Sequence, residues 1–370
     1  MPAHPSAMPS RPTFPAQPWV TWGKALASQV IVWHHLLIYG PLAPAAQTAW
    51  PAATDFVQEY GRLAVQVFLT VGGFLAARSL WPAPDAPRVS ARDWAERVLA
   101  RYLRLAPMLL LALAAAIAAA ALARAWMQDA DTPAAPTLTQ VLAHALLLQD
   151  IVGQPALSAG VWYVSIDLQL FALLAALAAL AHALLRPALP ATVRAAAGAL
   201  LLIAGVAASL VYFNRHSNGD IWAPYFLGAY GLGALAAWGQ RGARRLPATA
   251  LLAALIALAL LIDWRWRIAL AGLTALILLW QPWAAALTRS RLAALMTWLA
   301  SISYAVFLLH YPVSLTVNAA VMRATPATPL WRLAGLLATW LLTLACGWLA
   351  WRALEARPAR TRRGAALMRG

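Results

Sequence analysis

The 370-residue sequence contains a single cysteine and few charged side chains. Because Cys346 has no second cysteine to pair with, a disulfide framework and a thiolate metal site are excluded. Charged residues form only 11% of the chain, and no polar stretch is long enough to fold as a water-soluble domain. Motifs that bind RNA or DNA are also missing, so we expect no nucleic-acid partner.

We expect no secretory leader in residues 1–18. Residues 1–18 are rich in Pro, Ala and Ser, but they contain no apolar signal-peptide core and no cleavage site. We expect this segment to be a disordered cytoplasmic tail.

Apolar residues make up 62% of the chain, and runs of eighteen or more recur along it. Such runs can cross the hydrocarbon core of a bilayer as helices. We therefore predict an all-α, polytopic integral membrane protein with about ten transmembrane helices within residues 19–352. The expected spans are 20–40, 62–81, 103–125, 161–184, 193–213, 221–239, 247–262, 267–286, 295–319 and 330–352. The apolar segment Thr137–Ile151 is too short to span, and we expect it to lie at the interface or to re-enter the bundle.

The net charge of +16 comes almost entirely from arginine. An N-in, C-in orientation puts 21 of the 28 basic residues on the cytoplasmic side, including those of a basic tail at residues 353–370. This bias follows the positive-inside rule, which accounts for the charge better than nucleic-acid binding does. No internal repeat is detectable, so an inverted-repeat transporter architecture finds no support.

The first predicted span contains the ionisable residues Lys24 and His35. Such groups are costly at membrane depth and usually face a protein interior or a wet cavity. Eleven residues of helix bring the two side chains to within roughly 20° of one face and about 16 Å apart, whereas His34 points about 100° away. The alternative is a lysine that reaches the cytoplasmic headgroups and a histidine bonded between helices.

Three arginines follow helical spacing at the cytoplasmic entrance of the third span. Arg97, Arg101 and Arg104 lie at i, i+4 and i+7, so they form one basic ridge. Because guanidinium groups offer a planar fork of donors, the ridge is a candidate phosphate site. Taken singly, each arginine is better explained as an orientation signal.

Asp167 in the fourth span and His310 in the ninth are the remaining candidates at membrane depth. Their expected heights permit both to meet His35 in one layer in the outer half of the membrane, where a histidine is the natural partner of an aspartate. Pro312 follows His310 and predicts a kinked helix with a freed carbonyl. An interhelical clamp and a structural hydrogen bond are the alternatives. The outer segment Asn214–Asp220 is interpreted as a solvated turn that could touch a polar substrate.

Five segments between Trp22 and about Trp351 occur in the order found in one family of membrane enzymes. They are the pair Lys24 and His35, the segment Val67–Phe74, the pair Arg101 and Arg104, the segment Trp162–Asp167, and the segment Ile302–Pro312. On these residues the chain resembles the acyltransferase 3 family, which includes bacterial O-antigen and peptidoglycan O-acetyltransferases.

The chain departs from the family pattern at four positions. Lys24 stands where the family usually has arginine, and lysine lacks the bidentate fork. Gly72 replaces a serine, Gln66 lies near an expected acidic residue, and Asp167 holds a glutamate position. The periplasmic hydrolase-like domain fused to some members has no counterpart, so a second transfer step would need a separate periplasmic partner.

The resemblance implies a multi-pass protein of the bacterial inner membrane that moves an acyl group, expected to be acetyl, from cytoplasmic acyl-coenzyme A. The acceptor would be a hydroxyl of an exported or lipid-linked glycan, and membrane lipids are the other expected partner. Acyl-coenzyme A is a substrate, so no permanently bound cofactor and no metal are expected. His35 would be the general base, oriented by Asp167 or His310. The basic residues expected along the donor route are Lys24, Arg97, Arg101 and Arg104.

Other mechanisms and functions stay open at this point. Transfer can be direct or pass through an acyl-enzyme, and the lack of an obvious nucleophile favours direct transfer. A transporter or flippase would use His35, Asp167 and His310 as a proton or substrate relay. A non-catalytic scaffold would leave these buried groups without a purpose. A cytoplasmic coenzyme A site distinguishes the enzyme from the transporter.

Overall fold

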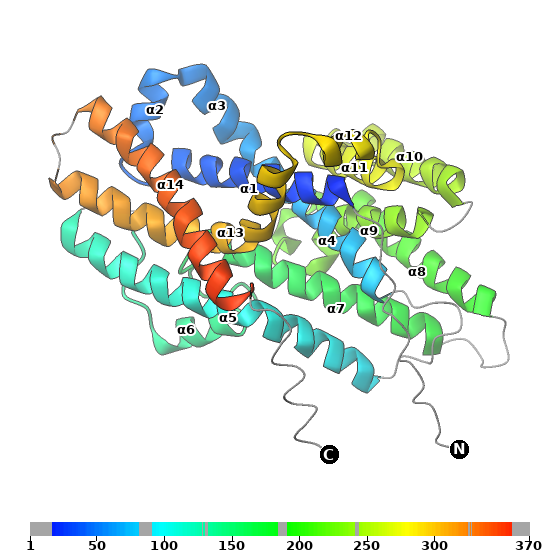
Figure 1. The fold of residues 1–370 in the computed structure, drawn as a ribbon. Coiled ribbons are helices and arrows are strands. Elements are labelled where there is room, and N and C mark those ends of the chain that lie inside the picture. The colour runs from blue at the N-terminus through cyan, green and yellow to red at the C-terminus, as the bar shows by residue number, and fades with distance from the viewer. Residues whose placement is uncertain are drawn as a thin grey trace, which may run out of the picture.

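The computed structural model describes residues 17–80, 91–127, 129, 132–183, 191–240, 244–324, 326 and 328–356, and all regular elements in these ranges are helices (Figure 1). The α-helices are α1 (Pro18–Ile38), α2 (Ala43–Ala49), α3 (Pro51–Tyr60), α4 (Ala64–Leu80), α5 (Ala91–Trp126), α6 (Leu138–Ala145), α7 (Val161–Ala183), α8 (Ala191–Val211), α9 (Ala223–Gly239), α10 (Arg245–Ile262), α11 (Trp266–Trp280), α12 (Ala284–Arg289), α13 (Ala293–Ala324) and α14 (Pro329–Leu354). Three short 3-10 helices are η1 (Gly61–Leu63), η2 (Phe213–Arg215) and η3 (Ser217–Gly219). The all-α prediction is therefore confirmed.

The two expected tails fall largely outside the described residues. Of the N-terminal tail at 1–18, residues 1–16 lie outside them, and α1 already begins at Pro18. Of the basic tail at 353–370, residues 357–370 lie outside, and α14 ends at Leu354.

Each of the ten predicted spans overlaps an α-helix, but several of these helices are too short to cross a membrane on their own. Within the described residues, seven helical stretches are long and apolar enough to cross a membrane. They are the stretch formed by α3, η1 and α4, and the helices α5, α7, α8, α10, α13 and α14. These helices support a multi-pass membrane protein, while the count of ten and the N-in, C-in orientation stay predictions.

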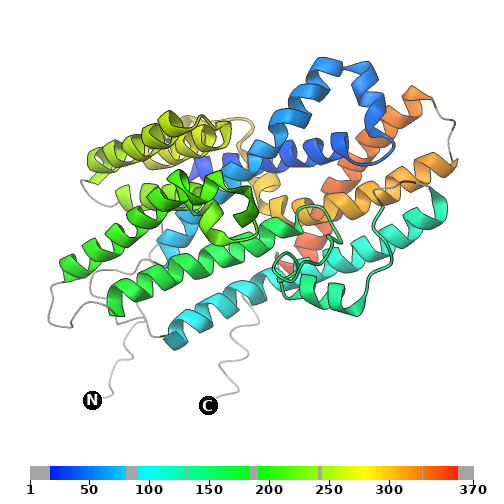
Figure 2. The same cartoon turned by 180° about the vertical axis from the view of Figure 1, so that it is seen from behind.

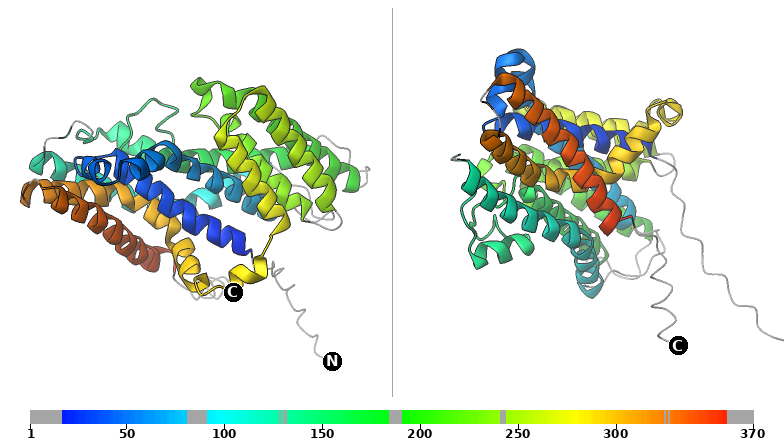
Figure 3. Two further views of the ribbon diagram at one scale, coloured as in Figure 1. Left: turned by 90° about the horizontal axis from the view of Figure 1, so that it is seen from above. Right: turned by 60° about the vertical axis from the view of Figure 1, so that its left-hand side comes forward.

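The helices form two groups that share α1. In one group α13 packs against α1, α5 and α14, and in the other α4 packs against α9, which also contacts α8 and α11. Viewed from above, α1 lies between these groups (Figure 3, left). Helix α1 therefore carries side chains that can meet both groups.

Helices α4 and α9 approach each other more closely than ordinary side chains permit. A Cβ atom on Gly73 would overlap the carbonyl oxygen of Tyr230, and one on Gly233 would overlap the carbonyl oxygen of Thr70. Small residues allow membrane helices to pack backbone against backbone. The glycines thus bring the α4 backbone directly against α9 next to Tyr230.

The segment before α7 doubles back along α5. Helix α6 begins after the N-cap Thr137, whose hydroxyl accepts a hydrogen bond from the Gln140 amide at 3.1 Å. Its last residue, Ala145, accepts a hydrogen bond from Tyr102, which lies in the first half of α5. Helix α6 therefore lies beside α5 (Figure 2). Contact with α5 fits both alternatives expected for Thr137–Ile151, so its place at the interface or inside the bundle stays a prediction.

Candidate active site

The structure brings His35 of α1 and His310 of α13 into direct contact. Nδ1 of His35 lies 2.7 Å from Nε2 of His310, and the two rings stack with centroids 4.8 Å apart. His310 is fully buried, whereas His35 keeps part of its surface exposed. Two of the three groups expected to share one layer thus meet.

The hydrogen bonds of this pair determine the neutral tautomers. Nδ1 of His310 lies 2.6 Å from the backbone carbonyl oxygen of Phe307. A carbonyl oxygen only accepts, so Nδ1 of neutral His310 carries the proton and Nε2 is left as an acceptor. His35 must then donate through its own Nδ1, which leaves Nε2 of neutral His35 with a lone pair. A histidine in this state can take a proton from a bound hydroxyl group.

His34 belongs to a different part of the structure. Its Nδ1 lies 3.0 Å from the carbonyl oxygen of Val57 in α3, and its side chain packs against Gly61. His34 therefore attaches α3 and η1 to α1, as expected for a histidine that does not share the face of Lys24 and His35.

Asp167 pairs with Arg101, so the expected histidine partner is wrong. Oδ2 of Asp167 lies 2.6 Å from a terminal nitrogen of Arg101. The Asp167 side chain is 8% exposed and the Arg101 side chain 26% exposed. The guanidinium group also lies over the ring of Phe171, 5.2 Å from its centroid. An expected height does not determine the direction in which a side chain points, and Asp167 of α7 points toward α5.

An aromatic cluster lies between the histidine pair and the ion pair. It consists of Phe68, Tyr163 and Phe307, whose ring centroids are 5.5 to 6.2 Å apart. Phe307 contacts His310, and Tyr163 precedes Asp167 by one helical turn. The two polar centres are therefore separate and not one three-residue site.

Two donors beside the ion pair lack a hydrogen-bond partner in the described part of the chain. They are Nε of Arg101 and the hydroxyl of Tyr230, and Tyr230 is fully buried. A Cβ on Gly72 would lie 3.2 Å from the Tyr230 ring and 3.4 Å from Oδ1 of Asp167, so the ring and the carboxylate flank one point of α4. Buried polar groups without partners mark places where water or a ligand completes the bonding. An acceptor atom such as a carbonyl oxygen suits this place.

Lys24 and Arg104 lie near Glu355, close to the end of α14. Lys24 interacts electrostatically with Glu355, Arg104 and Arg101. Glu355 directly follows α14, and partial burial raises the pKa of its carboxyl group while Arg104 and Lys24 oppose that effect. Arg104 is exposed and Arg97 is half-buried, so of the predicted basic ridge only Arg101 is paired with Asp167.

The outer segment Asn214–Asp220 contains a structural clamp. Asn214 is buried and donates to the carbonyl oxygen of Tyr225 at 3.0 Å. Arg265 donates to Oδ1 of Asn214 at 2.7 Å, and Arg267 donates to its backbone oxygen at 2.5 Å. These bonds tie the loop to α9 and to the start of α11, so the solvated turn expected here is wrong for Asn214.

Sequence reasoning missed Tyr230 and Glu355. Tyr230 lies in an apolar, glycine-rich helix, where nothing local distinguishes it from a packing residue. Glu355 carried a usable signal, because it is the sole acidic residue after Asp263 and precedes a basic tail.

Comparison with known proteins identifies the family of this chain. A family model described as an acyltransferase domain matches residues 17–351, which include the histidine pair and the Arg101–Asp167 ion pair. Comparisons with curated proteins and with solved structures give no match. Because the family match covers nearly the whole chain, the resemblance stated from the motifs is confirmed. The chain belongs to the acyltransferase 3 family and is a multi-pass membrane acyltransferase.

Proposed function

We propose that the protein is an acyl-coenzyme A-dependent O-acyltransferase of the bacterial inner membrane. It transfers an acyl group, in the first place acetyl, to a hydroxyl of an exported or lipid-linked glycan. The observation that supports this proposal most is the His35–His310 hydrogen bond, which leaves Nε2 of His35 able to accept a proton.

The reaction uses His35 first as a base and then as an acid. Nε2 takes the proton from the acceptor hydroxyl while the hydroxyl oxygen bonds to the thioester carbonyl carbon. The tetrahedral intermediate then collapses, the carbon–sulfur bond breaks, and the departing thiolate receives the proton from Nε2. His310 is a positioning residue, because its acceptor Nε2 holds Nδ1–H of His35 and favours the imidazolium that forms. Direct transfer of this kind needs one base and no covalent intermediate.

The donor route in this proposal begins at the cluster of Lys24, Arg104 and Glu355. Lys24 precedes His35 by eleven residues of continuous helix, about 16 Å of rise, which an extended pantetheine arm can cover. Arg104 and Arg97 are accessible enough to hold phosphate groups.

Arg101 takes a different role because Asp167 occupies one of its terminal nitrogens. In this proposal its Nε and the Tyr230 hydroxyl, which lack partners among the described residues, bind an amide carbonyl of the pantetheine arm. Asp167 is then a positioning residue that orients Arg101.

The test is transfer of labelled acetyl from acetyl-coenzyme A in inside-out membrane vesicles. We expect wild type to label an envelope fraction and His35→Ala to lower the rate by about 10²–10⁴-fold, the usual contribution of a general base. Binding of acetyl-coenzyme A should be retained in His35→Ala, because the base does not hold the donor phosphates.

The matched control is His34→Ala, which removes the neighbouring histidine that bonds Val57. Once corrected for the amount of folded protein, this variant should transfer acetyl at the wild-type rate. Equal activity of His35→Ala and wild type would exclude His35 as the base. If wild type neither binds nor consumes acetyl-coenzyme A, a transporter or a different acyl donor is the better account.

A further inference from the structure

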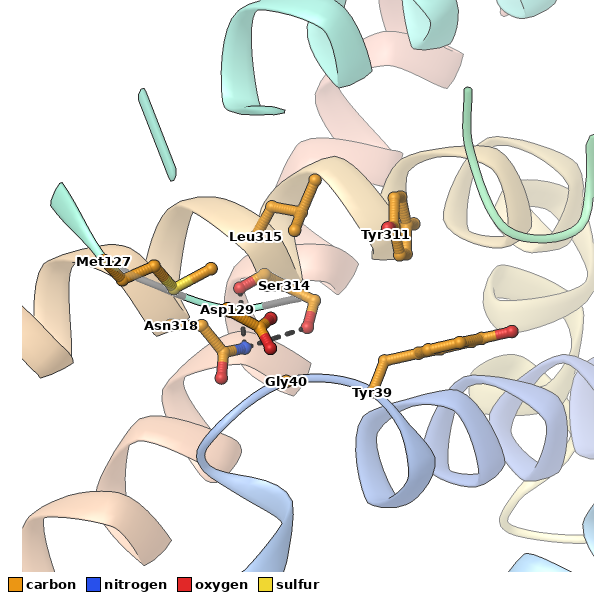
Figure 4. Close-up of a pocket in the computed structure, with 8 residues that line it drawn as sticks. All are labelled: Tyr39, Gly40, Met127, Asp129, Tyr311, Ser314, Leu315 and Asn318. Carbon is orange, nitrogen blue, oxygen red and sulfur yellow. Dashed lines mark hydrogen bonds between the residues drawn. The ribbon is translucent and has the colours of Figure 1, made fainter. Parts of the chain in front are cut away.

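The two ends of α1 are surrounded by different kinds of side chains. Beyond His35, Tyr39 and Gly40 line a small cavity together with Asp129 and Asn318 (Figure 4). The space inside is about 10 Å³, which is enough for one water molecule at most. This cavity therefore has no room for a substrate group.

Near its start, α1 lies among charged side chains. Lys24 is half-buried there and interacts electrostatically with Arg104 of α5 and with Glu355, which directly follows α14. Helix packing agrees with this placement, because α14 contacts both α1 and α5. In Figures 1 and 2 the end of α14 lies beside α5. Three helices thus bring two cations and one carboxylate together.

The backbone of Glu355 is fixed, whereas its side chain is exposed. Its amide donates to the carbonyl oxygen of Trp351 at 2.8 Å, and the Ala356 amide donates to the same oxygen at 2.9 Å. Trp351 packs against the hydrophobic core, and the preceding Ala350 is part of that core. The carboxylate itself is exposed, so rotation of the side chain alone can move it toward or away from the two cations.

The charges of this cluster attract one another without being bonded. Within the described residues, Lys24, Arg104 and Glu355 form no ion pair and no side-chain hydrogen bond. The neighbouring Arg101, in contrast, contacts Asp167 at 2.6 Å. A clamp between helices would use a direct contact of that kind. Glu355 instead compensates the two cations from a distance and leaves their hydrogen-bond donors available.

Lys24 and Arg104 are also the cations along the proposed donor route. Coenzyme A carries its negative charge on phosphate groups, and phosphate and carboxylate oxygens are attracted by the same ammonium and guanidinium groups. A carboxylate beside these cations therefore opposes phosphate binding. In the empty site, however, a half-buried ammonium without a counter-charge is costly. Glu355 suits the empty state, and the donor phosphates suit the occupied state.

We infer that Glu355 is a built-in competitor of the donor phosphates, which compensates Lys24 and Arg104 in the empty site and moves aside when acyl-coenzyme A binds. The inference rests on the proposed acyl transfer and adds the regulation of donor binding. Free coenzyme A, the product, carries the same phosphate groups as the donor. The carboxylate therefore weakens product binding as well and favours its release, a step that limits many enzymes.

The experiment measures the Kd of coenzyme A for the full chain in lipid nanodiscs, because this probe carries the phosphate groups but has no acyl group to transfer. Glu355→Gln removes the charge and keeps the length of the side chain, whereas Glu355→Asp keeps the charge and draws it back. The matched control is Glu96→Gln, which makes the same charge change on α5, where Glu96 bonds to Arg92 at 2.8 Å. Each protein is measured at low and at physiological salt.

Glu355→Gln should lower the Kd about fivefold at low salt, and the gain should shrink as salt rises, because ions screen exposed charges. Glu355→Asp should lie between this variant and wild type, and Glu96→Gln should match wild type.

Equal or weaker binding by Glu355→Gln, at an unchanged midpoint of thermal unfolding, would overturn the inference. An equal gain in Glu96→Gln would do the same, since it would show an effect of net charge alone. If Glu355→Gln does not fold, Glu355→Asp decides, and binding no tighter than wild type then contradicts the competitor. A wild type that does not bind coenzyme A at all contradicts the proposed function itself, before any variant is tested.

Discussion

The histidine pair and the Arg101–Asp167 pair are both buried between helices, yet they differ in charge and in bonding. The histidines form a neutral chain in which each Nδ1–H has an acceptor, and the remaining nitrogen is Nε2 of His35. The ion pair carries two full charges, and two donors at this place, Nε of Arg101 and the Tyr230 hydroxyl, have no partner among the described residues. The first arrangement has a vacant acceptor and the second has vacant donors.

This difference indicates different tasks. A vacant acceptor on a histidine suits movement of a proton, since histidine changes its charge near neutral pH. Vacant donors beside a permanent charge suit binding of a carbonyl oxygen, which gains a hydrogen bond without any proton transfer. The aromatic cluster of Phe68, Tyr163 and Phe307 keeps the two environments apart.

The largest effect on the folded state is expected when the ion pair is broken on one side. Asp167→Asn leaves the Arg101 charge without its counter-charge, and loss of one partner of a buried pair costs 3–5 kcal/mol. Because the Arg101 side chain is 26% exposed, we expect the lower end, about 3 kcal/mol, in the free energy of unfolding measured by denaturant titration. The double variant Arg101→Met with Asp167→Leu should recover most of the stability but not the affinity for acetyl-coenzyme A. If it recovers the affinity as well, the pair is structural only.

Substitutions of the neighbouring glycines Gly72 and Gly73 in α4 should have different effects, one on donor binding and the other on helix packing. Gly73→Ala places a methyl group into the Tyr230 backbone, so we expect destabilisation of at least about 1–3 kcal/mol, the usual range for overpacking. Gly72→Ala meets only the Tyr230 ring and Oδ1 of Asp167 at 3.2 and 3.4 Å, which small shifts relieve. The midpoints of thermal unfolding should rank Gly73→Ala below Gly72→Ala, and Gly72→Ala should still weaken donor binding. The reverse order would contradict the close approach of α4 and α9.

His310 is tested by removing and then restoring its acceptor. His310→Leu leaves Nδ1–H of His35 without a partner, which costs about 1–3 kcal/mol and corresponds to a fall in kcat of roughly 5- to 150-fold. His310→Gln offers a carbonyl oxygen at a similar reach and should recover part of kcat. Initial rates at saturating acetyl-coenzyme A measure both, and the KM for the donor should not change. Equal rates of the two variants would mean that His310 only fills space.

The smallest effect is expected at His144, which repeats the bonding of His310 in the segment that contains α6, outside the membrane-spanning helices. Its Nδ1 donates to the Gln140 carbonyl oxygen at 2.8 Å, and its Nε2 accepts from the Leu157 amide at 3.1 Å. Burial lowers the pKa of His144 below 6.5, against the opposing effects of the Gln140 bond and Asp150. A protonated ring cannot accept the Leu157 bond.

The folded state therefore binds fewer protons than the unfolded state below pH 6.5. The stability that His144 contributes is complete above pH 6.5 and falls as the pH decreases. Amide hydrogen exchange of residues 138–157 should be faster at about pH 5 than expected from intrinsic rates alone, and His144→Gln should remove this difference. If exchange follows the intrinsic rates at about pH 5 as well as near neutral pH, the hydrogen bond between His144 and the Leu157 amide is not lost in acid.

Much of the helical layout is predictable because it depends on local patterns. The fourth predicted span begins at residue 161, and α7 also begins at Val161. The start of an apolar run is visible in the sequence alone. That His35 and Lys24 lie on the same face of one helix also follows from helix geometry alone. The family motifs were readable for the same reason, because each lies within one continuous stretch of chain.

The contacts between helices were only partly predictable. Helix rise placed His35, His310 and Asp167 at compatible heights, but height says nothing about the direction in which a helix turns each side chain. His35 and His310 meet, while Asp167 faces α5 and bonds Arg101. The role of Tyr230 depends on the close approach of α4 and α9, which a glycine permits but does not dictate.

The sequence by itself determined that this protein is helical, that it belongs in a membrane and which residues carry ionisable groups at depth, because hydrophobicity and helical period are local properties. Only the tertiary structure decided the partners, since His35 and His310 are separated by 275 residues and Arg101 and Asp167 by 66. Contacts over such separations depend on the rotation and offset of whole helices. These are set by packing along their full length and not by the residues that meet.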